Sequence, residues 1–323
     1  MERELDLEQR RICIIGPGNW GTALKESFEA ASHKVVSLDR NASKTDWDEA
    51  FSEECLALVS CPFPAVESVI DQLSKVRKLS GVLNASKGID RKSMKTFSPL
   101  AEQKISAPIA TLSGPSFAAE LIQKKPTACV IAGRDAEFVS SLCDSLGTAW
   151  FRLYAHSDPV GVELCGSLKN VLAIACGISD ALKLGLNARA ALLSRALVEM
   201  FQLVEALGGR PATALGLAGV GDLWLTATGD LSRNRRLGLA LGAGKNIQEA
   251  LRELKTVEGY YTAQQVFEIS KRQALDLPIS QAVYRICYES AKPELELQRL
   301  MSRSLKIEES SLWQLSQIKP STK

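Results

Sequence analysis

Apolar residues follow two different patterns in the two parts of the chain. Up to about residue 155, short apolar runs of strand length alternate with stretches in which apolar residues recur at helical spacing. The predicted strands are residues 11–15, 34–38, 56–60, 81–85, 109–112, 128–132 and 149–153. The predicted helices between them are residues 20–31, 48–54, 65–79 and 137–146. This alternation predicts an α/β fold with a parallel, doubly wound sheet and helices on both of its faces.

After residue 155 the strand pattern ends and only helical periodicity remains. We therefore expect two domains, a sheet domain of residues 1–155 and an all-helical domain of residues 156–323. The first helix of the second domain is expected to end at Gly185, and Asn187 is expected to cap the next helix, residues 188–207.

A glycine-rich turn follows the first predicted strand. Gly16, Gly18 and Gly21 form the pattern GxGxxG, and a predicted helix and a second strand follow it. In a dinucleotide site the first glycine allows the tight turn, the second lets the pyrophosphate approach, and the third packs helix against strand. A turn that binds nothing is the alternative, but this context favours a Rossmann-type dinucleotide-binding domain.

The second predicted strand ends in Asp39 and Arg40, about where the ribose of a dinucleotide is recognised. An acidic residue there binds the 2′-hydroxyl of NAD, whereas an arginine binds the 2′-phosphate of NADP. Both residues are present, and Asp39 could turn away from the ribose or simply end the strand. We favour NADPH through Arg40 and keep NADH as the alternative.

Two further loops are predicted at the carboxyl ends of strands, where ligands bind in this class of sheet. The first contains Lys87, whose charge suits a phosphate or carboxylate, and the second contains Gly114 and Ser116. Each loop taken alone is also an ordinary turn, and the glycine-rich turn upstream is what favours a binding role.

Lys169 lies in the helix predicted before Gly185 but away from its apolar face. That face is formed by Leu164, Leu168, Val171, Leu172, Ala175, Ile178 and Leu182. The neighbours of Lys169 are small and uncharged: Cys165, Gly166, Ala173 and Cys176. One interpretation is a surface lysine whose stem covers apolar groups. The other is a desolvated ammonium that pairs with an anion and transfers a proton.

The segment of residues 216–238 carries polar groups suited to a small phosphate. It contains Asp222 in a glycine-rich stretch, followed by Ser232, Arg233 and Asn234 at an expected helix start. A hydroxyl, an amide and a guanidinium beside free backbone N–H groups would bind a phosphate. A capped, solvated helix with surface arginines is the alternative.

The overall composition excludes several classes of function. A net charge of +2 without a basic, aromatic stripe argues against nucleic-acid binding. The eight cysteines are scattered and there are only two histidines, so we expect reduced thiols and no metal site. The N-terminus lacks the apolar core of a signal peptide, and we expect no apolar run long enough to span a bilayer. We therefore expect a cytoplasmic protein without membrane contact.

Seven motifs in order along the chain identify a family. They are GPGNWGTAL from residue 16, SKGI from 86, SGPSFAAEL from 113, ELCGSLKNVLAIACGISD from 163, GLAGVGDL from 216, SRNRRLG from 232 and VEGYYTA from 257. With these motifs the chain resembles the bacterial-type NAD(P)-dependent glycerol-3-phosphate dehydrogenases over nearly its whole length. Residues 41–55 form a shorter segment than is usual in that family, so an element of the first half is expected to be missing there.

The resemblance implies reversible hydride transfer between NAD(P)H and dihydroxyacetone phosphate, giving sn-glycerol 3-phosphate for glycerophospholipid synthesis. It implies that Lys169 and Asp222 are catalytic. The implied substrate contacts are Lys87, Gly114, Ser116, Lys169, Asp222, Ser232, Arg233 and Asn234. The implied cofactor contacts are Gly16, Gly18, Asn19, Trp20, Gly21, Arg40, Lys87, Ala118, Arg233, Thr256 and Glu258. The apolar helical domain also makes a homodimer plausible.

Two other functions remain as alternatives. One is a reductase of the same plan that acts on a 2-keto acid or another sugar phosphate. The other is a module that binds the dinucleotide as a redox sensor without catalysis.

Overall fold

The structure is a computed structural model that describes residues 9–304. The chain forms two compact units that meet in sequence between Glu163 and Leu164. The polar N-terminal arm, in which no signal peptide was expected, lies outside the described residues up to residue 8.

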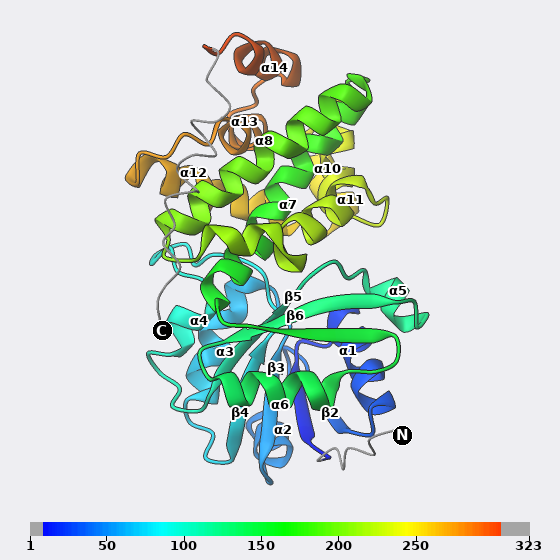
Figure 1. Ribbon diagram of the computed structural model, residues 1–323, viewed down its shortest axis with the longest axis vertical. Coiled ribbons are helices and arrows are strands. Elements are labelled where there is room, and N and C mark those ends of the chain that lie inside the picture. Colours follow the sequence, from blue (N-terminus) through cyan, green and yellow to red (C-terminus); the bar gives the residue numbers. More distant parts are fainter. Residues whose placement is uncertain (1–8, 305–323) are drawn as a thin grey trace. The chain divides into compact units, whose positions relative to one another are not determined.

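The first unit contains one sheet of seven strands in the order β2-β1-β3-β4-β5-β6-β7 (Figure 1). The strands are β1 (Arg11–Ile15), β2 (Lys34–Leu38), β3 (Cys55–Val59), β4 (Leu79–Asn84), β5 (Ile109–Ser113), β6 (Thr127–Gly133) and β7 (Phe151–His156). Strands β1 to β5 pair in parallel, as the sequence pattern predicts.

Six α-helices cover the two faces of this sheet (Figure 1). On one face lie α1 (Asn19–Ala30), α5 (Ala118–Ile122) and α6 (Ala136–Leu146). On the other lie α2 (Lys44–Ala50), α3 (Val66–Leu73) and α4 (Phe97–Ala101). The strands are apolar at successive positions because both faces are buried: Ile12 and Ile14 point into one core, and Cys13 and Ile15 into the other.

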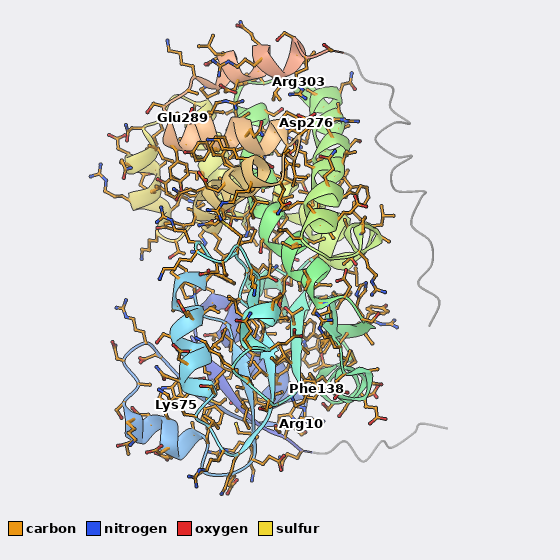
Figure 2. The ribbon with its side chains drawn as sticks, turned by 90° about the vertical axis from the view of Figure 1, so that its left-hand side faces the viewer. Arg10, Lys75, Phe138, Asp276, Glu289 and Arg303 are labelled. Carbon is orange, nitrogen blue, oxygen red and sulfur yellow. The ribbon has the colours of Figure 1, made fainter. Side chains whose placement is uncertain are left out.

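The end of the sheet differs from a wholly parallel arrangement. Strand β6 pairs antiparallel with β5, and β7 pairs in parallel with β6. The chain between β5 and β6 forms only the five-residue helix α5, which packs beside α1, so the chain enters β6 at the edge where β5 ends. Helix α6 then returns the chain to β7, with Phe138 packed against Gly81 of β4 (Figure 2).

The short segment after β2 does contain a helix. Helix α2 fills it, earlier in the chain than the predicted residues 48–54. Ser43 and Asp46 form a capping box that fixes its first turn, because each side chain accepts from the other residue's backbone N–H. The Ser43 hydroxyl also donates to the Asp46 carboxylate. The helix predicted in this segment is therefore present, and the expectation that a further element of the family is missing there stays a prediction.

The second unit is built of helices. Its α-helices are α7 (Pro159–Ala181), α8 (Gly185–Ala206), α9 (Asp222–Thr228), α10 (Arg233–Gly242), α11 (Ile247–Leu254), α12 (Glu258–Arg272), α13 (Pro278–Tyr288) and α14 (Pro293–Met301). A 3₁₀ helix, η2 (Pro211–Leu215), and a π-helix, η3 (Leu217–Gly221), precede α9. Near α14 the carboxylate of Asp276 holds Arg303 at 2.7 Å (Figure 2).

Helix α7 differs from the amphipathic helix that its sequence suggested. Nearly every residue from Gly161 to Ser179 is buried, on all sides of the helix. Within residues 9–304 it is also the one helix that is long and apolar enough to cross a membrane, which corrects the expectation that no such run exists. In its most apolar window 94% is buried inside the protein, as in the core helix of a globular unit.

Helix α8 begins at Gly185, three residues before the position predicted. Asn187 is therefore in its first turn and is not its cap, which was a wrong prediction. The chain leaves α7 through Lys183 at φ 56° and turns at Gly185 at φ 88°, so helical geometry resumes before Asn187 is reached.

Candidate functional site

The glycine-rich turn joins β1 to α1, and its three glycines have different surroundings. Gly16 has φ 92°, and a side chain there would collide with the backbone of Cys61 at 2.8 Å. A Cβ on Gly21 would lie 2.6 Å from Ser60 Oγ and 2.7 Å from the carbonyl oxygen of Gly16. A Cβ on Gly18 would meet nothing within 4 Å. The first and third glycines are required by the fold, and the second leaves room for a ligand.

The N-terminus of α1 is open to an anion. Its cap is Gly18, which has no side chain to accept a hydrogen bond, and its first turn contains no acidic residue. The backbone N–H groups of Asn19, Trp20 and Gly21 have no acceptor in the part of the chain that the structure describes. Free N–H groups at the positive end of a helix are what a pyrophosphate requires.

The two candidates for ribose recognition differ in availability. Asp39 accepts a hydrogen bond from the backbone N–H of Asn41 at 2.7 Å, so one of its carboxylate oxygens is used within the turn. Arg40 is exposed, and no ion pair from it is formed within residues 9–304. This arrangement leaves the guanidinium available for a 2′-phosphate, although Asp39 retains a second oxygen.

The remaining candidates of the first unit lie at the same edge of the sheet. Lys87 is half-buried after β4, and Gly114 and Ser116 follow β5. Gly114 has φ 148° and packs against the backbone of Cys129, while Ser116 Oγ donates to the Gly114 carbonyl at 3.0 Å. Ala118 begins α5. The carboxyl ends of β1, β2, β4 and β5 thus bring these loops to one edge.

Lys169 is buried in the second unit, with a side chain only 10% exposed. Its Nζ donates to Asp222 Oδ1 at 2.6 Å and to Thr226 Oγ1 at 2.9 Å. The interpretation of Lys169 as a surface lysine is therefore wrong. The carboxylate of Asp222, itself 1% exposed, provides the anion that a buried ammonium requires and stabilises its charged form.

The π-helix before α9 positions Asp222, the first residue of α9 and the partner of Lys169. The π-helix η3 directly precedes Asp222, and Gly219 in it lies so close to Ala214 that a Cβ would be 2.0 Å from the Ala214 carbonyl oxygen. Asp222 and Thr226 are four residues apart, so both face α7, and Thr226 Oγ1 also lies 3.2 Å from Asp222 Oδ1. The two groups hold the lysine head from one side.

A chain of amide hydrogen bonds connects three other helix positions. Asn234 Nδ2 donates to Asn170 Oδ1 at 2.9 Å, and Asn234 Oδ1 accepts from the backbone N–H of Gly259 at 2.8 Å. Asn170 Nδ2 donates to Glu258 Oε2 at 3.1 Å. Asn170 follows Lys169 directly, so the network ties the catalytic candidate's helix to the first turns of α10 and α12. Thr256 lies exposed just before α12.

The start of α10 has the form expected for a phosphate site. Ser232 is the N-cap, and its Oγ accepts from the backbone N–H of Arg235 at 3.1 Å, which leaves its hydroxyl hydrogen for a ligand. The backbone N–H groups of Arg233 and Asn234 have no acceptor among residues 9–304, and the Arg233 side chain is exposed. An anion would find two N–H groups, a hydroxyl and a guanidinium here.

The structure therefore gathers the predicted residues into one group in each unit. In the second unit Lys169, Asp222, Asn234 and Glu258 belong to connected hydrogen-bond networks. Sequence reasoning missed Thr226 and Asn170. The signals were present, because Thr226 is four residues after Asp222 on one helix face and Asn170 is adjacent to Lys169.

All eight cysteines are thiols, and six of them are buried. No group of three or more His, Cys, Asp or Glu side chains suited to a metal occurs within the described range 9–304.

Comparison with known proteins identifies the same family over both units. The models of the N-terminus and C-terminus of NAD-dependent glycerol-3-phosphate dehydrogenase match residues 42–139 and 158–298. A glycerol-3-phosphate dehydrogenase [NAD(P)+] of Xanthomonas euvesicatoria pv. vesicatoria is 38% identical, over 92% of this chain and 96% of that one. The enzyme of that name from Stenotrophomonas maltophilia is also 38% identical, with the same coverage.

Solved structures agree with this result. The crystal structure of glycerol-3-phosphate dehydrogenase from Coxiella burnetii is 35% identical, covers 91% of this chain and 99% of its own, and has a TM-score of 0.83. The Plasmodium falciparum glycerol-3-phosphate dehydrogenase, 19% identical over 93% of this chain and 97% of its own, has a TM-score of 0.78 and shows the fold alone. The expected fold class, a Rossmann-type sheet unit with an all-helical second unit, is confirmed. The chain belongs to the NAD-dependent glycerol-3-phosphate dehydrogenase family.

Proposed function

We propose that this protein transfers a hydride reversibly between NAD(P)H and dihydroxyacetone phosphate and forms sn-glycerol 3-phosphate. The observation that supports this most directly is the buried Lys169–Asp222 ion pair at 2.6 Å in a chain of this family. A lysine buried with one carboxylate and one hydroxyl is a proton donor in a fixed position. The family membership gives the substrate, and the ion pair gives the chemistry.

The surroundings of the glycine-rich turn fit a bound dinucleotide. The open space at Gly18 and the free N–H groups of Asn19, Trp20 and Gly21 would hold the pyrophosphate. Arg40 would bind the 2′-phosphate, which favours NADPH, and NADH remains usable. Further contacts are assigned to Gly16, Lys87, Ala118, Arg233, Thr256 and Glu258. When bound, the reduced nicotinamide supplies the hydride.

The phosphate of the substrate is assigned to the start of α10. Ser232, Arg233 and Asn234 would bind it through a hydroxyl, a guanidinium and backbone N–H groups, with Lys87, Gly114 and Ser116 of the first unit as further contacts. The phosphate group is remote from the reacting carbonyl of the substrate. The free energy gained by binding the phosphate would orient that carbonyl for reaction. A phosphate site would therefore increase the rate of hydride transfer at the carbonyl carbon.

Lys169 is assigned as the general acid. As the carbonyl carbon is reduced, charge develops on its oxygen, and the ammonium stabilises this charge and donates a proton to it. Asp222 and Thr226 fix the direction of Nζ. In the reverse direction the neutral amine takes the proton from the alcohol.

The test is an absorbance assay of NADPH and NADH consumption with dihydroxyacetone phosphate. We expect consumption of both cofactors, with the lower KM for NADPH. If neither is consumed while cofactor binding is seen by nicotinamide fluorescence, the protein is the redox sensor and the proposal fails. Turnover of a 2-keto acid in place of the triose phosphate would support the other alternative.

The setting of this activity is also proposed. We infer a cytoplasmic enzyme whose product is the backbone precursor of glycerophospholipids. We place dinucleotide binding in residues 1–155 and substrate binding and catalysis in residues 156–323, without a role for nucleic acid or membrane. The protein is inferred to act as a homodimer, which sedimentation of the purified chain would test.

A further inference from the structure

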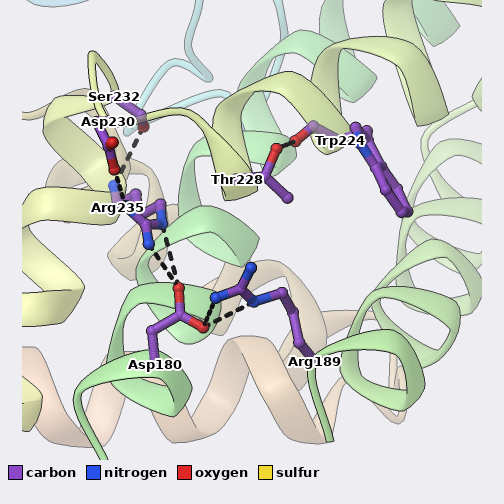
Figure 3. Close-up of polar contacts among 7 residues, drawn as sticks. All are labelled: Asp180, Arg189, Trp224, Thr228, Asp230, Ser232 and Arg235. Carbon is purple, nitrogen blue, oxygen red and sulfur yellow. Dashed lines mark hydrogen bonds and ion pairs between the residues drawn. The ribbon is translucent and has the colours of Figure 1, made fainter. Parts of the chain in front are cut away.

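A buried ion pair connects the end of α7 to the beginning of α10 (Figure 3). The carboxylate oxygen Asp180 Oδ2 accepts from Arg235 Nη2 at 2.8 Å and from Arg235 Nε at 3.2 Å. Arg189 Nε of α8 donates to the other oxygen, Oδ1, at 2.8 Å. The side chains of Asp180 and Arg235 are only 10% and 11% exposed, so both charges have lost most of their water. Charges are buried in this way only where each is paired.

Arg235 does not stabilise α10 through the helix dipole. It is in the first turn, where the positive end of the dipole disfavours a cation. Its guanidinium instead contacts Asp180 on one side and Asp230 Oδ1, at 2.7 Å from Nη1, on the other. Its backbone N–H is the group that Ser232 caps. Arg235 therefore contacts both Asp230 and Ser232 in the turn before α10 and attaches that turn to Asp180 of α7.

Glycines allow α10 to lie directly against α7 next to this ion pair. A Cβ on Gly177 would be 2.1 Å from the carbonyl oxygen of Arg235, and a Cβ on Gly238 would be 2.1 Å from that of Ile174. A Cβ on Gly242 would be 2.7 Å from Ala181 Cβ and 2.9 Å from the carbonyl oxygen of Ile178. Arg235, Gly238 and Gly242 are three and four residues apart, so they form one face of α10. The backbones are in contact, and the ion pair fixes the end of the helix.

We propose that Asp180 and Arg235 are positioning residues that hold the start of α10 in the geometry that binds the phosphate dianion of the substrate. This inference rests on the proposed function, which assigns the phosphate to Ser232, Arg233 and Asn234. Asp180 and Arg235 do not touch the ligand themselves. Since Arg235 is neutralised by Asp180 and Asp230, the charge that faces the phosphate is that of Arg233.

The chain contains a matched control for this arrangement. Glu296 of α14 is 1% exposed and is flanked by two arginines, Arg285 at 2.6 Å and Arg299 at 2.6 Å. Asp180 is flanked in the same way by Arg189 and Arg235. Both carboxylates are buried in the helical unit, but Glu296 connects α13 with α14 and has no part in the turn before α10. Glu296→Gln therefore removes a similar ion pair without affecting the phosphate site.

The experiment compares Asp180→Asn and Glu296→Gln with the wild-type enzyme. For each, KM and kcat are measured with dihydroxyacetone phosphate and with unphosphorylated dihydroxyacetone, and inhibition is measured with inorganic phosphate. For Asp180→Asn we expect the KM for dihydroxyacetone phosphate and the inhibition constant of phosphate to rise roughly tenfold or more. The kcat/KM for dihydroxyacetone should stay within about twofold, because it has no phosphate to position. Glu296→Gln should lower the melting temperature and leave both KM values unchanged.

Several results would overturn the positioning role. They are an unchanged KM for dihydroxyacetone phosphate in folded Asp180→Asn, equal losses with both substrates, or the same KM change in Glu296→Gln. If Asp180→Asn does not fold, Arg235→Lys keeps the charge but loses the fork and should raise the same KM. Failure of both variants to fold would show a purely structural pair. Failure of the proposed function is a separate result, because wild-type enzyme would then not reduce dihydroxyacetone phosphate.

Discussion

Lys169 shows how much a single side chain depends on its partners. Alone in a buried helix, its ammonium would favour the neutral form, which cannot act as a general acid. The carboxylate of Asp222 at 2.6 Å compensates the lost hydration, and Thr226 at 2.9 Å fixes a second direction. The lysine is thus paired, oriented and largely shielded from water before any substrate binds.

Lys169→Ala should lower kcat by a factor of about 10² to 10⁴, the usual contribution of a general acid. Cofactor binding, measured by nicotinamide fluorescence, should not change. Lys292→Ala removes an exposed lysine of the same unit and should retain full turnover. A near wild-type kcat in Lys169→Ala would remove Lys169 from the mechanism.

Thr226→Val should lower kcat by roughly tenfold with little change in KM, because one hydrogen bond that directs Nζ is lost from a buried site. The control is Thr228→Val, two residues later on α9. Its hydroxyl donates to the Trp224 carbonyl at 2.8 Å (Figure 3). Equal kinetic effects of the two variants would contradict a role for Thr226 in directing the lysine.

The sequence predicted Lys169 and Asp222 but could not show that they touch. They are separated by the whole of α8, η2 and η3, and only the fold brings Nζ and Oδ1 together. Asn170 and Thr226 were missed for a different reason. Neither side chain carries a charge, so neither is unusual in a helical sequence until its hydrogen-bond partner is known.

At the scale of elements, the three glycines after β1 meet two different requirements, one of the fold and one of the ligand. Gly16 and Gly21 have no room for a side chain, whereas Gly18 has open space and ordinary extended backbone, with φ −74°. The fold needs the first two, and the ligand needs the third. Substitutions at these positions should therefore have different effects.

Gly18→Ala should weaken NADPH binding by at least about tenfold without lowering the melting temperature, since the added methyl group occupies only ligand space. Gly21→Ala should lower the melting temperature, because its Cβ collides with Ser60 Oγ and the Gly16 carbonyl. Fluorescence titration and thermal unfolding of both variants measure the two effects. A destabilised Gly18→Ala with normal cofactor affinity would contradict this division of roles.

Strands β1 and β2 end at the residues predicted from apolar runs, because strands buried on both faces have clear sequence limits. The direction of β6 could not be predicted, since apolar runs carry no information on pairing direction. Six of the seven apolar residues read as one amphipathic face lie in α7, and Leu182 follows its last residue. The polar residues between them, Ser167 and Asn170 among them, are also buried, and the Asn170 amide forms hydrogen bonds with Asn234 and Glu258.

At the scale of the whole molecule, two buried carboxyl groups each secure the start of a helix on another element. Glu163 accepts from the Ser98 backbone N–H and hydroxyl in α4, and Glu199 accepts from the backbone N–H groups of Ile279 and Ser280 in α13. Burial raises the pKa of Glu163 and of Glu199 to about 7, although these hydrogen bonds act in the opposite direction.

These carboxyl groups should make the stability of the enzyme fall as the pH rises from about 4.5 to 7. Because the folded-state pKa lies above the unfolded value of 4.5, the folded chain keeps protons that the unfolded chain has lost. The stabilisation is complete below pH 4.5 and is lost as the pH passes 7. Each group would account for about 3 kcal/mol of the free energy of unfolding.

Denaturant unfolding at a series of pH values measures this effect. Glu163→Gln and Glu199→Gln should each flatten the slope between pH 4.5 and 7, while Glu289→Gln, at an exposed position, should leave it unchanged. An unaltered slope in both buried variants would show that the two carboxyl groups are already ionised at pH 5.

The boundary between the two units falls inside α7, between Glu163 and Leu164, and this restricts how the enzyme can be recombined. A hybrid with the first unit of one relative and the second of another must be joined within a continuous helix. One residue inserted at that junction would rotate Lys169 by about 100° relative to Glu163 and move it by about 1.5 Å. Functional hybrids should therefore preserve the six-residue spacing of these two positions, whichever parents supply them.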